Sequence, residues 1–140
     1  MERSLHILLV EDDDTHAALV NRVFDKLLVS VDRVTDAIQA TAYLWEKPPF
    51  TGRRRPDLML LDLGLPGSSG HELLQRLKSD PAWADLVIVV LTSSTDPEDI
   101  RRAYCAYANS YLVKPLGYRE LEEMLTSLVS YWSRWNTYLY

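Results

Sequence analysis

A chain of 140 residues, 47% of them hydrophobic and 25% charged, is long enough for one globular domain with a sizeable core. Its formal net charge of −5 argues against nonspecific binding to nucleic acid, which requires a basic surface to replace the counterions of the phosphates. The single cysteine, Cys105, has no partner for an internal disulfide, which is compatible with a reducing compartment.

The start of the chain predicts no signal peptide. Glu2 places an acid where a signal peptide carries positive charge, and the apolar run that follows ends at Val10. Every apolar run is much shorter than the roughly 20 residues that span a bilayer. We therefore expect a cytoplasmic protein with no membrane contact.

Four short, nearly continuous apolar runs predict strands that are buried on both faces, as in a parallel sheet. They cover residues 5–10, 58–63, 86–91 and 111–113. A weaker run, 29–34, predicts an edge strand because Ser30 and Asp32 interrupt it.

Segments with helical spacing alternate with these runs. They cover residues 15–28, 37–45, 71–77, 95 onward and 118 to about 132. Asp14 and Asp36 are the expected N-caps of the first two helices, and Pro97 stands at the first position of the fourth.

Five strand–helix units of this kind predict a doubly wound α/β fold, a three-layer sandwich with right-handed crossovers. In such folds, ligands bind outside the carboxyl ends of the strands. The stretch 47–56 holds three prolines and the arginine run Arg53–Arg55, which predicts a long surface loop. We expect the arginines to be solvated, with a docking patch as the alternative.

Polar side chains gather at the predicted carboxyl ends of four strands. Glu11 and Asp12 follow the first strand, Asp62 the third, Thr92 the fourth and Lys114 the fifth. Carboxylates held close together repel one another, and an oxygen-rich site with room for water suits Mg²⁺. Such a cation, an ammonium and a hydroxyl together can stabilise a phosphoryl group on a carboxylate nucleophile. The pattern predicts an aspartyl-phosphate site.

The segments that carry this pattern resemble receiver domains of two-component signalling. They are ILLVEDD at 7–13, PDLMLLDLGLPGSSG at 56–70, VVLTSS at 89–94 and YLVKP at 111–115. The resemblance implies a five-stranded parallel sheet in the order 2-1-3-4-5, as in CheY and flavodoxin, with the receiver domain over residues 1–130. It implies a signalling module rather than an enzyme, apart from Mg²⁺-assisted self-phosphorylation and self-dephosphorylation.

The resemblance also assigns roles to individual residues. Asp62 is the implied phosphoacceptor, and it shares Mg²⁺ with Asp12 and with the backbone carbonyl of Gly64. Glu11 is implied to hold a metal-bound water.

Four further roles follow from the same resemblance. Lys114 and Thr92 contact the phosphoryl group, and the Lys114–Pro115 peptide is expected to be cis. Tyr111 matches an aromatic switch position whose ring moves with the Thr92 hydroxyl. An ordinary core aromatic is the alternative for Tyr111.

Five other polar residues near these motifs have simpler interpretations. Asp13 and Asp14 are expected to be solvated or to cap a helix rather than to bind the metal. His6, His16 and His71 lie away from the predicted strand ends, so we expect none of them to be catalytic or a ligand.

The chain continues past the fifth helix as an aromatic extension, residues 131–140, too short for a separate output domain. This extension and the long loop are similar to stand-alone response regulators paired with cyanobacterial phytochrome histidine kinases, which implies such a kinase, a downstream protein and a homodimer. Aromatic residues are enriched at interfaces. The expected interface residues are Trp132, Trp135, Tyr138 and Tyr140, and the alternative is that they fold back on their own domain.

Two other functions remain open. A Mg²⁺-dependent phosphatase or phosphotransferase can also use an aspartyl phosphate, but it generally needs a second acid two residues after the nucleophile, where this chain has Gly64. A nonphosphorylated interaction module would keep the fold without the chemistry, and the complete set of polar residues argues against it.

Overall fold

The computed structural model describes residues 3–67 and 69–139. The strands are β1 (His6–Val10), β2 (Ser30–Val34), β3 (Leu58–Leu61), β4 (Val87–Thr92) and β5 (Ser110–Val113). The helices are α1 (Asp14–Lys26), α2 (Ala37–Leu44), α3 (Gly70–Lys78), α4 (Pro97–Cys105) and α5 (Tyr118–Ser130), followed by a π-helical turn, η1 (Tyr131–Trp135). Every strand and α-helix predicted from the sequence is present.

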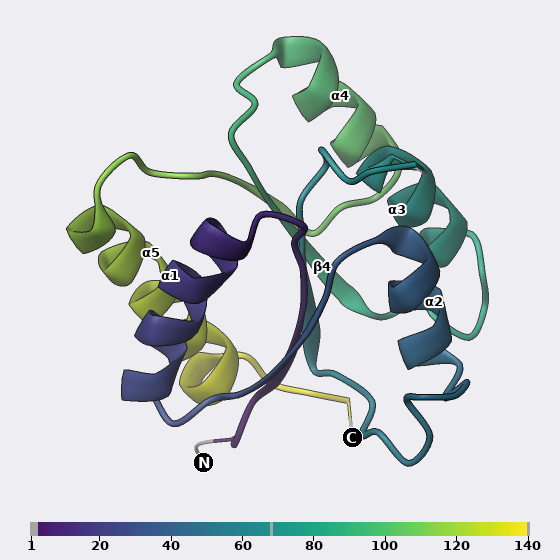
Figure 1. Ribbon diagram of the computed structural model, residues 1–140, viewed down its shortest axis with the longest axis horizontal. Coiled ribbons are helices and arrows are strands. Elements are labelled where there is room, and N and C mark those ends of the chain that lie inside the picture. Colours follow the sequence, from purple (N-terminus) through teal and green to yellow (C-terminus); the bar gives the residue numbers. More distant parts are fainter. Residues whose placement is uncertain (1–2, 68, 140) are drawn as a thin grey trace.

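The strands form one parallel sheet in the order β2-β1-β3-β4-β5. Helices α1 and α5 cover one face of the sheet, and α2, α3 and α4 cover the other (Figure 1). The predicted three-layer, CheY-like fold is therefore confirmed, including the position of β2 at the edge. In the described part of the chain, no helix is both long enough and apolar enough to cross a membrane.

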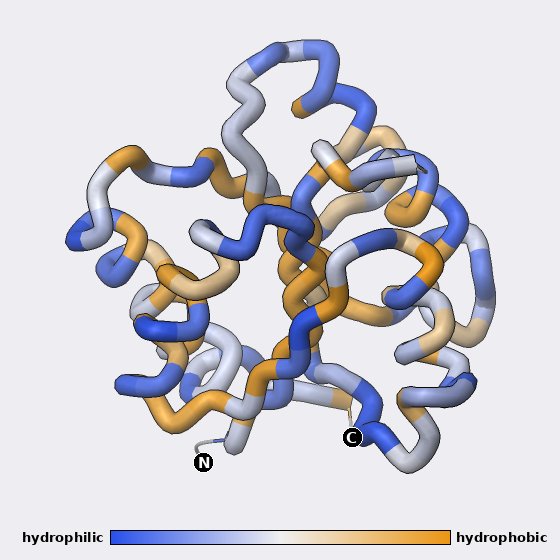
Figure 2. Tube along the Cα trace, viewed as in Figure 1, coloured by the Kyte–Doolittle hydropathy of each residue, from blue (hydrophilic) through white to orange (hydrophobic). Residues whose placement is uncertain are grey.

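The sheet separates two hydrophobic clusters because alternate residues of each strand point to opposite faces. Leu8 of β1 packs in one cluster with Leu74 of α3. Its neighbour Leu9 packs in the other with Phe24 of α1 and Leu125 of α5. Figure 2 shows the resulting concentration of hydrophobic residues along the central strands. Each such fully buried side chain contributes roughly 1.5–3 kcal/mol.

Aspartates cap several helices, with one difference from the sequence prediction. Asp13, not Asp14, caps α1: its backbone is extended (φ −79°, ψ 110°) and its side chain accepts the N–H groups of Thr15 and His16. Asp14 is already helical, so its side chain cannot fold back onto the first turn in the same way. Asp36 caps α2 as predicted.

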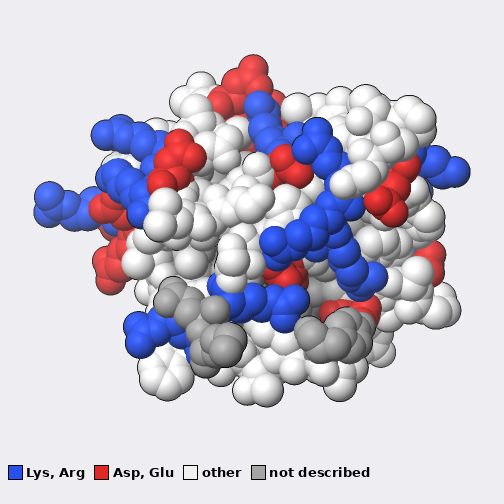
Figure 3. All heavy atoms as spheres, turned by 90° about the horizontal axis from the view of Figure 1, so that it is seen from below, with Lys and Arg blue, Asp and Glu red and all other residues white. Residues whose placement is uncertain are grey.

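The long loop before β3 lies at the amino ends of the strands, on the face shown in Figure 3. Its arginines pair with nearby acids: Arg54 Nη2 lies 2.6 Å from Asp57 Oδ2, and Arg55 Nη2 lies 2.8 Å from Asp85 Oδ1. The Arg55 guanidinium also stacks over the Trp83 ring at 4.3 Å. The arginine run therefore ties the loop to its own domain.

The aromatic extension turns back along the domain. Trp132 packs against the cluster formed by α1 and α5, and the Tyr138 hydroxyl donates to the Trp132 carbonyl at 2.8 Å. The Arg3 guanidinium lies 3.9 Å from the centre of the Tyr138 ring. These two aromatics follow the fold-back alternative, whereas Trp135 is 70% exposed. Tyr140 lies outside the described residues.

His6 takes part in a buried network of polar side chains at the amino end of β1. Its Nδ1 lies 2.8 Å from Ser30 Oγ, and its Nε2 lies 2.6 Å from the Tyr43 hydroxyl. That hydroxyl donates to Asp32 Oδ2 at 2.6 Å. Burial lowers the pKa of His6 and outweighs the attraction of Asp32 for the protonated ring.

This shift predicts a pH dependence of stability. Because the pKa of His6 is lower in the folded than in the unfolded chain, the unfolded state binds more protons below the ordinary value of 6.5. The stabilisation is complete above pH 6.5 and is lost as the pH falls through the folded-state pKa. We expect the free energy of unfolding in urea to fall more steeply from about pH 7 to about pH 5 in the wild type than in His6→Gln. Equal slopes would contradict this assignment.

Gly70 permits a close approach between α3 and the end of β3. A Cβ at this position would lie 2.5 Å from the carbonyl oxygen of Asp62 and 2.6 Å from the Cα of Leu63. Because both atoms belong to the backbone, they cannot move aside cheaply.

We expect Gly70→Ala to lower the free energy of unfolding by about 1–3 kcal/mol, as overpacking does. Gly117→Ala is the matched control, since a Cβ there would meet only the Glu120 Oε1 atom, at 3.8 Å. Urea denaturation measures both variants. A loss in Gly70→Ala no larger than in the control would show that the close contact relaxes freely.

Candidate functional site

The carboxyl ends of the strands bring the predicted polar residues to one edge of the sheet. Glu11 follows β1, Asp62 follows β3, Thr92 ends β4 and Lys114 follows β5. Glu11, Asp62 and Thr92 are buried, with 1%, 9% and 4% of their surface exposed. The Lys114 ammonium lies 2.6 Å from Glu11 Oε1 and 3.0 Å from Asp62 Oδ2, so it bridges two acids from different strands.

Backbone hydrogen bonds hold these residues in register. The Asp62 N–H donates to the Val10 carbonyl at 3.1 Å, which extends the β1–β3 ladder by one residue. The Lys114 N–H donates to the Thr92 carbonyl at 2.8 Å, which does the same between β4 and β5. The site residues therefore continue the buried strands.

Three carboxylates form a donor set for a metal. Glu11, Asp12 and Asp62 each offer an oxygen, and these oxygens all lie within 4.8 Å of one another. Asp12 is exposed whereas the other two are buried, so one side of the set faces solvent. Carboxylate oxygens with room for water suit a hard divalent cation such as Mg²⁺. The Gly64 N–H donates to Asp62 Oδ1 at 3.1 Å, and a ligand role for the Gly64 carbonyl remains a prediction.

The charges at the site are strongly coupled. Burial raises the pKa of Glu11 to about 7, against the opposing effect of Lys114. Burial also acts to raise the pKa of Asp62, but hydrogen bonds with Glu11, the Gly64 N–H and Lys114 outweigh it, so this pKa is lowered. These effects favour the ionised form of Asp62 and the protonated form of Glu11.

His16 lies beside this site, although we expected it to lie away from the strand ends. Its Nε2 lies 3.8 Å from Glu11 Oε1, and 13% of its side chain is exposed. Burial lowers the pKa of His16, and the nearby Lys114 lowers it further. Its expected location was wrong because the first turn of α1 packs beside the end of β1. That His16 is neither catalytic nor a ligand stays a prediction. The sequence feature that could have indicated this location is the position of His16 in the first turn of α1, three residues after the cap Asp13.

Tyr111 connects β5 to the loop after β4. Its hydroxyl donates to the Ser94 carbonyl at 2.9 Å, while its ring packs against the hydrophobic core. The Ser94 hydroxyl in turn donates to Asp99 Oδ2 at 2.6 Å, and His71 Nε2 lies 3.1 Å from Asp99 Oδ1. Tyr111 thus contacts the segment that directly follows Thr92, and its switch role remains a prediction.

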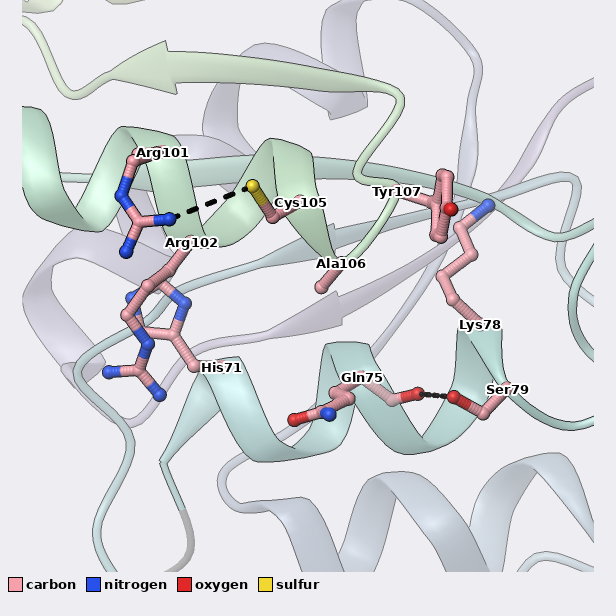
Figure 4. Close-up of a pocket in the computed structure, with 9 residues that line it drawn as sticks. All are labelled: His71, Gln75, Lys78, Ser79, Arg101, Arg102, Cys105, Ala106 and Tyr107. Atoms are coloured by element: carbon pink, nitrogen blue, oxygen red, sulfur yellow. Dashed lines mark hydrogen bonds between the residues drawn. The ribbon is translucent and has the colours of Figure 1, made fainter.

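A separate hollow lies between α3 and α4 (Figure 4). His71 and Gln75 line it from α3, and Arg102 and Cys105 line it from α4. None of the carboxylates at the strand ends reaches this hollow. This hollow is therefore separate from the carboxylates at the edge of the sheet.

The peptide bond after Lys114 differs from the expectation. Within residues 3–67 and 69–139, the only cis peptide bond is Pro48–Pro49, in the long loop, so the prediction of a cis Lys114–Pro115 bond was wrong. The trans form before proline is favoured by roughly 0.5–1 kcal/mol. Proline thus permits a cis bond without imposing one.

Comparison with known proteins identifies the family. The response regulator receiver domain matches residues 7–126. The chain is 40% identical to the Probable methanogenesis regulatory protein FilR2 of Methanothrix harundinacea (strain 6Ac) over 132 residues, which is 93% of this chain and 84% of the relative. It is 33% identical to response regulator Rcp1 of Synechocystis sp. (strain ATCC 27184 / PCC 6803 / Kazusa) over 128 residues, 90% of this chain and 87% of the relative.

Solved structures of response regulators are also similar to this chain. The phosphorylated cyanobacterial phytochrome response regulator RcpA superposes with a TM-score of 0.90 at 31% identity, over 96% of this chain and 98% of that one. The Mn²⁺-bound form of Rcp1 superposes with a TM-score of 0.87 at 32% identity, over 95% and 97% of the two chains. From its sequence match, its fold and the residues at its strand ends, this chain belongs to the family of response regulator receiver domains.

Proposed function

We propose that this protein acts as a response regulator by accepting a phosphoryl group on Asp62 from a phosphohistidine kinase, in a step that requires Mg²⁺. The observation that carries the proposal is the Lys114 ammonium, 3.0 Å from Asp62 and 2.6 Å from Glu11, beside a set of three carboxylates. The likeness to the phytochrome response regulators RcpA and Rcp1 supports a phytochrome-type kinase as the donor.

In this mechanism the Asp62 carboxylate forms a new P–O bond while the P–N bond of the phosphohistidine breaks and the imidazole leaves. The lowered pKa of Asp62 keeps the carboxylate ionised for the attack. The Lys114 ammonium, which lies beside Asp62, can donate a hydrogen bond to a phosphoryl oxygen. The Thr92 hydroxyl is a second possible donor.

Glu11, Asp12 and Asp62 are the residues that would hold the cation. When bound, Mg²⁺ neutralises negative charge on the carboxylates and on the phosphoryl oxygens. The Mn²⁺-bound form of Rcp1 supports a divalent cation in this family. Glu11 would gain a positive counter-charge from such a cation, which would favour its ionised form.

The two other functions considered from the sequence are less well supported. A phosphatase or phosphotransferase would need an acid where Gly64 stands, and Gly64 has no acidic side chain. An interaction module without phosphorylation would have no use for a buried lysine between two acids, since such a cluster is costly to desolvate.

We expect acetyl phosphate with Mg²⁺ to add one phosphoryl group to the wild type and none to Asp62→Asn, which keeps the size of the side chain. In Lys114→Ala the reaction should be slower by about 100-fold or more, as when one preorganised donor is removed. Intact-protein mass spectrometry measures the gain, and hydroxylamine should remove it as it does an acyl phosphate. A wild type that gains no mass, or a gain that persists in Asp62→Asn, would refute the mechanism.

The proposal includes a homodimer that uses the exposed part of the aromatic extension. Trp135 is 70% exposed and Leu139 is 89% exposed, so both are available for an isologous contact. Removal of residues 131–140 would be an ambiguous test, because it would also strip Trp132 and Tyr138 from the protein's own core.

We therefore expect the single substitution Trp135→Ala to convert a dimer into a monomer in sedimentation equilibrium. Ile38→Ala, at a position that is 79% exposed on α2, is the matched control and should leave the dimer intact. A monomeric wild type, or a Trp135→Ala variant of unchanged mass, would exclude this contact.

A further inference from the structure

The His16 ring has a buried nitrogen with no hydrogen-bond partner. Its Nε2 is one of four such side-chain atoms in the described part of the chain. Buried polar atoms in native proteins are nearly always paired, and each exception asks for an explanation. At His16 the unpaired atom faces a carboxylate of the metal site, 3.8 Å away, which is just beyond hydrogen-bond distance.

Each oxygen of the carboxylate that His16 faces has one partner in this structure. Glu11 Oε1 lies 2.6 Å from the Lys114 ammonium, and Glu11 Oε2 accepts the Asp13 N–H at 3.3 Å. In the proposed function, Lys114 also donates a hydrogen bond to the phosphoryl group. If the ammonium turned toward phosphoryl oxygens, Glu11 Oε1 would lose this partner, and His16 Nε2, 3.8 Å away, could replace it.

The backbone keeps the ring in this place. His16 stands on the first turn of α1, and its N–H donates to Asp13 Oδ1 at 3.3 Å. The same cap also binds the N–H of Thr15 at 2.9 Å. The capped first turn thus fixes the backbone of His16, and the remaining gap of 3.8 Å to Glu11 lies between two side chains.

His16 does not stand in the set of metal donors itself. The carboxylate oxygens that share a distance of 4.8 Å come from Glu11, Asp12 and Asp62, and His16 is not among them. The contact of the ring with this set is the one to Glu11. Outer residues of this kind orient the groups that hold a metal and strongly affect its affinity.

We propose that His16 is a positioning residue that donates from Nε2 to Glu11 and so orients this carboxylate toward the divalent cation. The proposal rests on the proposed function, because it concerns the same cation. It differs from a packing role in that it requires a donor at the position of Nε2, which the side chain of glutamine can supply and that of leucine cannot.

The test uses Mn²⁺ alone as the probe, with the full-length protein at one fixed pH. Electron paramagnetic resonance of free Mn²⁺ gives the affinity of each variant. His16→Leu should bind Mn²⁺ about 10- to 100-fold more weakly than the wild type. His16→Gln should stay within a few-fold of the wild type, and Thr15→Ala, the exposed neighbour on the same turn, should not differ from it.

The outcomes separate this inference from the function on which it rests. If the wild type binds no Mn²⁺, or if Asp12→Asn binds it as well as the wild type does, the proposed metal site and the role of His16 both fail. If the wild type binds and His16→Leu binds equally well, only the role of His16 fails. If His16→Gln is as weak as His16→Leu while urea denaturation shows both to be folded, the donor role is overturned.

Discussion

The balance of charge around Lys114 is the constraint on which the functional edge of this protein depends. Its ammonium lies between Glu11 and Asp62, two acids that are almost fully buried and come from different strands. Without it, two carboxylates would face each other in a medium that solvates neither, and one of them would be neutral. With it, the pKa of Asp62 is lowered, which favours the ionised carboxylate. Burial raises the pKa of Glu11, so Glu11 is the acid of the pair that binds a proton more readily.

The parallel sheet makes this arrangement possible. Its strands are buried on both faces, so their ends emerge together at one edge from a rigid support. Gly70 lets α3 approach the backbone of Asp62, and the cap Asp13 brings the first turn of α1 over Glu11. The helices thus enclose the acids on two sides, while Asp12 keeps the site open to solvent.

Most of the fold and the principal site could be predicted because both depend on short-range patterns. Apolar runs without alternation identify buried strands, and the polar residue after each run identifies the edge where ligands bind. The predictions failed where neighbours in space decide the outcome. The cap of α1 is Asp13 rather than Asp14, the peptide after Lys114 is not cis, and His16 lies beside Glu11. No local pattern shows which residue in the first turn of a helix will face the end of the strand before it.

The aromatic extension shows the same contrast between what local sequence patterns predict and what neighbours in space decide. The sequence alone determined the order of the elements, the residues at the strand ends and the presence of aromatic residues after α5, because propensity and periodicity act within a few residues. Only the tertiary structure decided that Trp132 and Tyr138 return to their own domain while Trp135 stays exposed. It also decided that a histidine on α1 faces the acids of the site. Trp132 and Tyr138 pack against residues of β1 and α1 that lie far from them in the chain. His16 is close to Glu11 in the chain, but the packing of α1 beside the end of β1 decides that its ring faces this acid. In both cases the three-dimensional neighbours jointly set burial and charge.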